Sequence, residues 1–129
     1  METSLWGNLI MGALPPGVQV VRFARPNLDE WLKHAPDIES CALFEELREM
    51  VLDGLGEGQT LVLNLALVEF ASVEFLKLLL LIRRVVGAYQ GRLILCRPGT
   101  ALVERLRNYG LLGQFQMTTT ESEALALSA

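Results

Sequence analysis

Residues 60–80 read TLVLNLALVEFASVEFLKLLL, and this stretch decides the fold. Its first part, residues 60–65, is a nearly continuous apolar run, which is typical of a β-strand covered on both faces. After a turn, apolar residues continue from Phe75 to Val86, a length that suits a helix of three turns. Because a charged side chain at mid-bilayer costs about 2.5–3.5 kcal/mol, we predict no membrane span across residues 61–82, which are interrupted by Asn64, Glu69, Glu74 and Lys77.

The segments on either side of this stretch alternate between strand-like and helix-like patterns. Short apolar runs predict three further strands, at residues 18–23, 92–96 and 115–117. Apolar residues at helical spacing predict helices at residues 39–52 and 100–109, and a short helix through Trp31 and Leu32. The capping box Thr120-Glu121-Ser122-Glu123 predicts a last helix through Leu127. This alternation predicts an α/β domain with a mixed, largely parallel β-sheet and helices packed against it.

The limits of the domain follow from the same patterns. Residues 1–16 show no clear period and lead into Pro15-Pro16-Gly17, so we predict an irregular N-terminal arm before a single domain at residues 17–127. Acidic Glu2 stands where a secretory signal carries positive charge. We therefore predict a cytoplasmic bacterial protein whose thiols are reduced.

The chain is acidic, and its charge is unevenly distributed. It holds 11 Lys and Arg against 15 Asp and Glu, a formal net charge of −4. Residues 1–60 carry most of the acids, including Glu45, Glu46 and Glu49, which we place on the solvated face of the helix at 39–52. An acidic chain lacks long-range attraction to phosphate backbones, so nucleic acid is not a predicted partner.

Few residues could carry catalysis or hold a metal ion. Cys41, Cys96 and His34 are too few for a zinc site of the usual four ligands, and we predict no metal and no cofactor. His34 has no serine or cysteine nearby in the sequence to form a nucleophile–base pair. Cys96 ends an apolar strand and precedes Arg97, whose charge could lower a thiol pKa, but a buried, inert thiol is the preferred interpretation. Acidic residues near Cys41 disfavour the thiolate form of its side chain, so we predict no catalytic role for this thiol.

Residues 61–80 resemble the signature segment of the STAS family, the sulphate-transporter and anti-sigma-factor-antagonist domains. Three further stretches are similar to the family in their order, at residues 18–23, 91–98 and 111–115. The resemblance covers residues 17–127 and implies a STAS-like fold. It also implies a non-enzymatic domain of signal transduction and transcription regulation, which binds an anti-sigma factor or a serine kinase.

The turn before the helix departs from the family pattern. In the family this turn reads Asp-Ser-Ser/Thr-Gly-Leu, and a partner kinase phosphorylates its first serine. Here Ser72 stands at the Asp, Val73 at the phosphorylated serine, and Glu74 and Phe75 at the next two positions, while Leu76 matches. The resemblance therefore implies docking without the usual phosphoserine switch. Shifting the alignment by one residue would make Ser72 the acceptor, so Ser72 is our phosphorylation candidate.

The residue types in this turn are consistent with more than one role. Ser72 is a good N-cap for a helix that begins at Val73, because its hydroxyl can accept a free N–H group of the first turn. Glu74 lies where negative charge favours the helix dipole, and it is a candidate to stand in for a phosphate. The predicted docking surface consists of Ser72, Val73, Glu74, Phe75, Lys77 and Leu78.

The helix after the turn has apolar residues over a wider arc than one contact with a sheet needs. Its second apolar stripe, Leu78, Ile82 and Val85, is either core or an interface with a partner or a second copy of the chain. Two other functions stay open at this point. One is a small-molecule or nucleotide-binding domain that uses the strand ends near Asn64, and the other is a thiol enzyme that uses Cys96.

Overall fold

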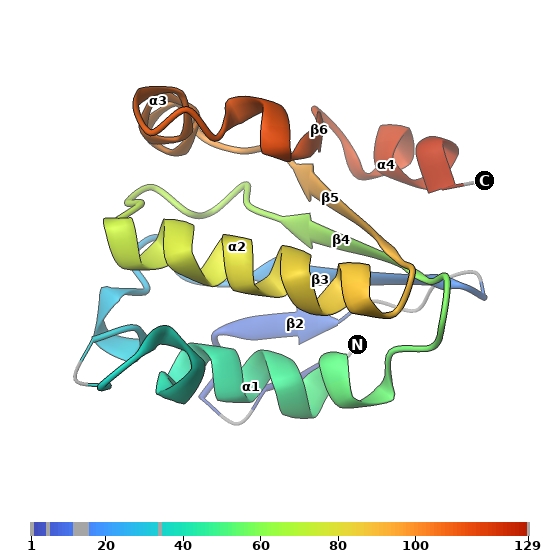
Figure 1. Cartoon of the computed structure of the whole chain (residues 1–129), viewed down its shortest axis with the longest axis horizontal. Helices are drawn as coiled ribbons and strands as arrows, with labels where there is room; N and C mark the ends of the chain where they lie inside the picture. The colour runs from blue at the N-terminus through green and yellow to red at the C-terminus, as the bar shows by residue number, and fades with distance from the viewer. Residues whose placement is uncertain (1, 5, 12–15, 34, 129) are drawn as a thin grey trace.

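A mixed β-sheet runs through the molecule in a computed structural model that describes residues 2–4, 6–11, 16–33 and 35–128 (Figure 1). Within these residues the sheet has six strands in the order β1-β2-β3-β4-β5-β6. The neighbours from β3 to β6 pair in parallel, whereas β1 and β2 extend the sheet with antiparallel pairs. The strands are β1 (Glu2–Thr3), β2 (Leu9–Met11), β3 (Val18–Phe23), β4 (Thr60–Asn64), β5 (Arg92–Cys96) and β6 (Gln116–Thr118).

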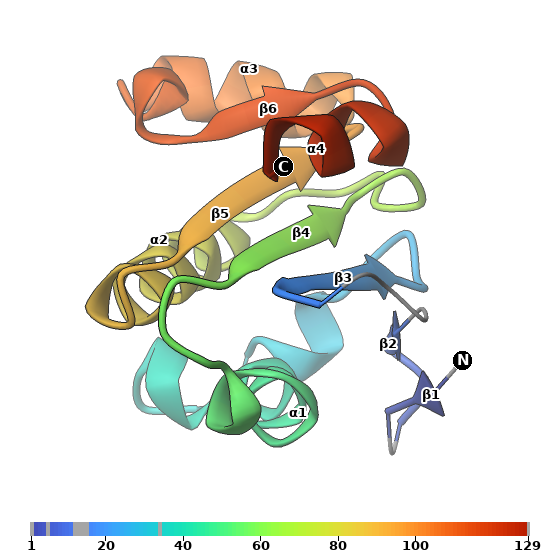
Figure 2. The ribbon, with the colours of Figure 1, turned by 90° about the vertical axis from the view of Figure 1, so that its right-hand side faces the viewer.

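Helices cover both faces of this sheet (Figure 2). Buried residues of α1, α2 and α3 share one core cluster with Leu61 and Leu63 of β4, and these helices lie on one face. On the opposite face, Ala124 of α4 packs in a smaller cluster with Val62 and Ile94. The α-helices are α1 (Ala42–Met50), α2 (Val73–Ala88), α3 (Thr100–Asn108) and α4 (Glu121–Ser128). Single 3-10 turns are η1 (Asp29–Trp31), η2 (Ile38–Ser40), η3 (Leu52–Gly54) and η4 (Leu112–Gln114).

The predicted alternation of strands and helices is confirmed, with two helices shorter than expected. The helix expected at 39–52 is α1 between the 3-10 turns η2 and η3, because Cys41 is extended, with φ −71° and ψ 152°, and separates η2 from α1. The short helix expected through Trp31 and Leu32 is the single turn η1. By contrast, α2 begins at Val73 and ends at Ala88, slightly longer than the predicted helix.

The N-terminal residues differ most from the prediction. β2 pairs along β3 and Leu9 is fully buried, so the expectation of an irregular arm is wrong for residues 2–3 and 9–11. Strands of two and three residues are too short to show a period, and only the pairing of β1 with β2 and of β2 with β3 defines them. The limits of the domain at residues 17–127 stay a prediction. Residues 12–15 and His34 lie outside the described residues.

Glu46 of α1 was expected on the solvated face, and this expectation is wrong. Its side chain is only 4% exposed and accepts hydrogen bonds from Asn8 Nδ2 at 2.5 Å and from Ser4 Oγ. Arg25 Nε in turn donates to Asn8 Oδ1 at 2.6 Å. A buried carboxylate is tolerated only when donors replace its water, and the N-terminal segment supplies these donors. The network therefore ties this segment to α1, whereas Glu45 and Glu49 are exposed as predicted.

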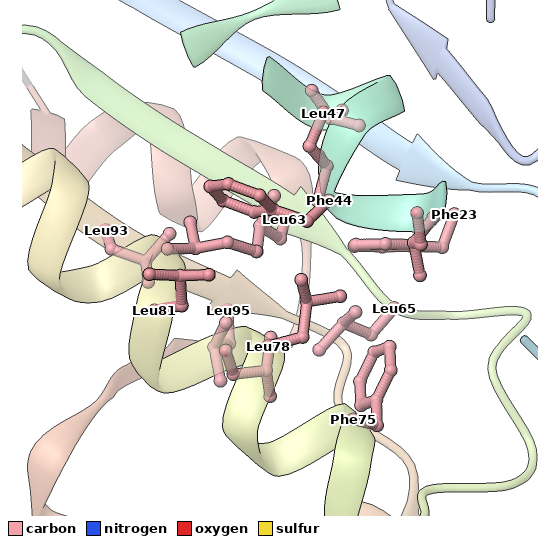
Figure 3. Packing of buried hydrophobic residues seen from close by; sticks show 14 of the residues in the cluster. Phe23, Phe44, Leu47, Leu63, Leu65, Phe75, Leu78, Leu81, Leu93 and Leu95 are labelled. Atoms are coloured by element: carbon pink, nitrogen blue, oxygen red, sulfur yellow. The ribbon is translucent and has the colours of Figure 1, made fainter. Parts of the chain in front are cut away.

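The helix α2 is the central element of the larger core cluster (Figure 3). Its side chains Phe75, Leu78 and Leu81 lie among residues of β4, β5 and α1, and the Phe75 ring meets that of Phe23 edge-on at 5.7 Å. In the second stripe, Leu78 and Ile82 are fully buried and Val85 is half-buried. The interpretation of this stripe as core is therefore the correct one.

The apolar segment 61–82 is divided among β4, a loop and the first turns of α2. Among the described residues, no helix combines the length and the hydropathy needed to cross a membrane.

Glu121 in the first turn of α4 holds this helix to the sheet. Its carboxylate accepts hydrogen bonds from Arg22 Nε at 2.8 Å and Arg22 Nη2 at 2.7 Å, and from Asn64 Nδ2 at 2.5 Å. Arg22 and Asn64 are register partners on β3 and β4, so they reach the same carboxylate. The hydrogen bonds from Arg22, and then those from Asn64, hold the pKa of Glu121 below its ordinary value.

Leu78→Ala should lower the free energy of unfolding by about 2–5 kcal/mol, because it leaves a cavity in the core. Urea unfolding followed by circular dichroism measures this. The matched control is Leu67→Ala in an exposed leucine, which should change the stability by no more than about 0.5 kcal/mol. A Leu78→Ala protein as stable as the wild type would contradict the core assignment.

Acid should destabilise the protein partly through Glu121. Its lowered pKa stabilises the fold above the ordinary carboxyl value of 4.5, and this contribution is lost as the pH falls through the lower pKa of the folded state. Urea unfolding of the wild type and Glu121→Gln at a series of pH values measures the difference. The difference in free energy of unfolding between the two proteins should become smaller as the pH falls. A difference that does not change with pH would contradict this role for Glu121.

Candidate docking site

The loop between β4 and α2, residues 65–72, is held to the sheet from both sides. The N–H of Leu65 donates to the carbonyl oxygen of Cys96 at 2.9 Å, which continues the pairing of β4 with β5. On the other side, the N–H groups of Glu69 and Phe70 both donate to the carbonyl oxygen of Pro26, at 2.9 and 3.0 Å. Val68 is also buried, so the loop is anchored by both hydrogen bonds and packing.

Ser72 closes this loop and begins α2. Its backbone is extended, and its Oγ accepts a hydrogen bond from the N–H of Phe75 at 3.2 Å. This is the N-cap predicted from the sequence, and it satisfies one of the free N–H groups of the first turn. Ser72 is half-buried, and Glu74 in the same turn is exposed, where its charge favours the helix dipole.

The structure divides the predicted docking residues into two groups. Ser72 and Val73 are partly exposed, Glu74 and Lys77 are exposed, and these four lie at or near the start of α2. Phe75 and Leu78 are 1% and 0% exposed, so the expectation that they contact a partner is wrong in this structure. They fail as docking residues because the same side chains fill the core between α2 and the sheet.

Two exposed apolar side chains beside this turn were missed in the sequence. Leu67 is 59% exposed and Phe70 is 56% exposed, although the loop that carries them is anchored. Within the loop they alternate with buried Val68 and Ala71, so an apolar run in the sequence hides which members face outward. We use the name docking loop for residues 65–72 together with the exposed residues Val73, Glu74 and Lys77 of α2.

Neither described cysteine has the environment of a reactive thiol. Both Cys41 and Cys96 are buried, and burial raises the pKa of each thiol. Cys41 Sγ accepts the N–H of Phe44 at 3.3 Å and so caps α1. Cys96 lies under α4 in the smaller cluster, next to Ala124. These thiols therefore have structural roles in packing and capping.

The sheet is parallel from β3 to β6 and has helices on both faces, so the chain is an α/β domain. Residues 40–124 match the family model of the STAS domain. The chain belongs to the STAS domain family. No curated protein sequence matches it significantly.

Several solved structures share this fold at low sequence identity. A putative anti-sigma factor antagonist from Thermotoga maritima superposes with a TM-score of 0.73 at 18% identity, over 93% of each chain. A STAS domain protein from Planctomyces limnophilus gives a TM-score of 0.63 at 16% identity, over 94% of this chain and 98% of that one. The anti-sigma factor antagonist SpoIIAA in its unphosphorylated form gives 0.60 at 20% identity, over 92% and 94%. These matches confirm the predicted STAS-like α/β fold.

Ser72→Ala should lower the free energy of unfolding by about 0.5–2 kcal/mol, because the N–H of Phe75 loses its acceptor. Ser72→Asp should retain most of the wild-type stability, since aspartate caps a helix as well as serine does. Urea unfolding of the two variants measures both values. Equal losses in Ser72→Ala and Ser72→Asp would contradict the capping role.

Proposed function

We propose that this chain is a non-enzymatic signalling domain that docks another protein through the docking loop. Membership in the STAS family supports the proposal, as does the similarity to two structures described as those of anti-sigma factor antagonists, one of them putative. By analogy the partner is an anti-sigma factor or a serine kinase, and the setting is transcription regulation in a bacterial cytoplasm. A similar fold alone does not assign a function, so the residues of the docking loop must carry the rest of the argument.

The observation that carries this proposal is the exposure of Leu67 and Phe70 on an anchored loop. Exposed apolar side chains lower solubility and do not stabilise the fold. They stabilise a complex when a partner removes them from water. The loop is already fixed by its hydrogen bonds to Pro26 and Cys96, so docking requires little ordering. Preorganised apolar anchors of this kind are typical centres of protein interfaces.

Charged residues beside the anchors supply specificity. Glu74 and Lys77 are exposed on α2 next to Val73, and they present one negative and one positive charge to a partner. Val73 stands where the resemblance places the phosphorylated serine, and valine has no hydroxyl to accept a phosphate. We propose that Glu74 provides a fixed negative charge and that docking is constitutive, without a phosphoserine switch.

The other functions considered from the sequence have less support. A thiol enzyme needs an accessible thiolate, whereas Cys96 is buried and its thiol pKa is raised. A homodimer through the second stripe of α2 would need Leu78 and Ile82 at the surface, and both are fully buried.

Phe70→Asp should abolish capture of the natural partner from lysate of the source cells, because it places a charge among the apolar residues of the docking loop. The matched control is Tyr109→Asp, which changes an exposed aromatic residue of similar exposure just after α3. Mass spectrometry should identify the captured protein as an anti-sigma factor or a serine kinase. Equal capture by Phe70→Asp and the wild type would contradict the proposal, and so would a partner of another class.

Intact-mass measurement of the protein from its own cells, before and after phosphatase treatment, tests the absence of the switch. We expect an unchanged mass, because Val73 cannot be phosphorylated. A phosphatase-sensitive addition of one phosphate group that fragment mapping assigns to Ser72 would contradict constitutive docking.

Glu74→Gln should weaken partner binding if the fixed charge contributes, and unchanged affinity would exclude that role.

A further inference from the structure

A cleft of 610 Å³ lies at the carboxyl ends of β5 and β6. Figure 2 shows the arrows of the parallel strands ending on this side of the molecule. Its volume is within the range of small-molecule sites, about 300–1,000 Å³. The carboxyl ends of parallel strands are where open α/β sheets bind ligands. The lining residues are Ala66, Arg97, Pro98, Gly99, Met117, Thr118, Thr119 and Glu123.

Arg97 supplies the positive charge of this cleft. Its backbone is in the left-handed region at φ 52°, and its N–H donates to the carbonyl oxygen of Thr118 at 2.8 Å, which fixes the residue directly after β5. Within the described part of the chain, its guanidinium makes no ion pair. A guanidinium with this freedom can bind a carboxylate through two parallel hydrogen bonds.

Glu123 supplies the negative charge. Its carboxylate oxygens accept hydrogen bonds from Thr119 Oγ1 at 2.6 Å and from the Thr119 N–H at 3.3 Å, which fix it beside β6. These hydrogen bonds hold the pKa of Glu123 below its ordinary value, so it is ionised at neutral pH. Each oxygen keeps a further lone pair for a ligand donor. Arg97 and Glu123 line the same cleft without pairing to each other in the described structure.

The cleft also has an apolar part. Met117, Pro98 and Ala66 also line it, and Gly99 lies where the cleft meets the docking loop. A Cβ atom added at Gly99 would lie 3.3 Å from the carbonyl oxygen of Val68, so this approach leaves little room for a side chain. A molecule that matches this lining therefore carries a negative charge, a positive charge and a short apolar part.

We propose that this cleft binds a small amino-carboxylate, with its carboxylate on Arg97, its ammonium group on Glu123 and its aliphatic part on Met117 and Pro98. The carboxylate of Glu123 would repel a simple anion and would have no positive partner in it. Arg97 would likewise repel a simple amine and would have no negative partner in it. A zwitterion satisfies both charges within one cleft. The cleft shares Ala66 with the docking loop, but Arg97 and Glu123 lie outside that loop, and the site does not depend on the proposed function.

Amide NMR spectra of the full chain, titrated with γ-aminobutyrate and with ε-aminohexanoate, test this proposal. These two probes carry the same charges at different spacings. Hexanoate and hexylamine are matched controls that each lack one charge. At least one amino-carboxylate should produce saturable shifts in the amides of Ala66, Gly99 and Thr119, with an affinity about tenfold higher than either control, which corresponds to about 1.4 kcal/mol.

Two charge variants and one control test which charged group of the ligand contacts Arg97 and which contacts Glu123. Arg97→Gln should weaken binding of the amino-carboxylate about tenfold. Glu123→Gln keeps the acceptor for Thr119 but removes the charge, and it should reduce the affinity to that of hexanoate. Arg107→Gln, an exposed arginine of α3 outside the cleft, should bind like the wild type. The proposal is overturned if no amino-carboxylate binds saturably, if hexanoate binds equally well, or if both cleft variants retain wild-type affinity.

Discussion

The packing of α2 against β4 and β5 is the interaction on which the rest of the structure depends. Phe75, Leu78 and Leu81 fill the space above the sheet, and Phe75 also meets Phe23 of β3 (Figure 3). Burial of such side chains stabilises a fold by about 1.5–3 kcal/mol each. Because this packing fixes where α2 begins, it also fixes the loop that joins the helix to β4.

That constraint has a functional consequence at the carboxyl end of the sheet. The loop before α2 cannot turn all of its apolar residues inward, since most of the core beneath it is already occupied. Val68 and Ala71 of this loop are buried, whereas Leu67 and Phe70 are exposed. On the other side of the same sheet end, α4 is held by Glu121, and Glu123 two residues later lines the cleft. One packed helix and one partly exposed ion pair thus shape two neighbouring surfaces.

Much of the fold could be read from local patterns, and most of the docking surface could not. The strands at 18–23 and 92–96 and the cap at Ser72 follow from residue types and spacing. The burial of Glu46 could not be predicted, because its donors Ser4 and Asn8 are distant in sequence. The exposure of Leu67 and Phe70 in the docking loop could not be predicted for a related reason. Buried and exposed residues of an apolar run are of the same chemical kind.

The sequence by itself determined the class of fold, because the periods of apolar residues and the signals of glycine, proline and capping residues act over a few neighbours. The resemblance to the family also predicts that Val73 stands at the phosphorylated position. Only the tertiary structure decided which apolar residues form the core and which charges share a cleft. Phe75 and Phe70 are five residues apart and chemically identical, yet one is 1% exposed and the other 56%. The difference arises from packing between segments distant in the chain, which no local pattern encodes.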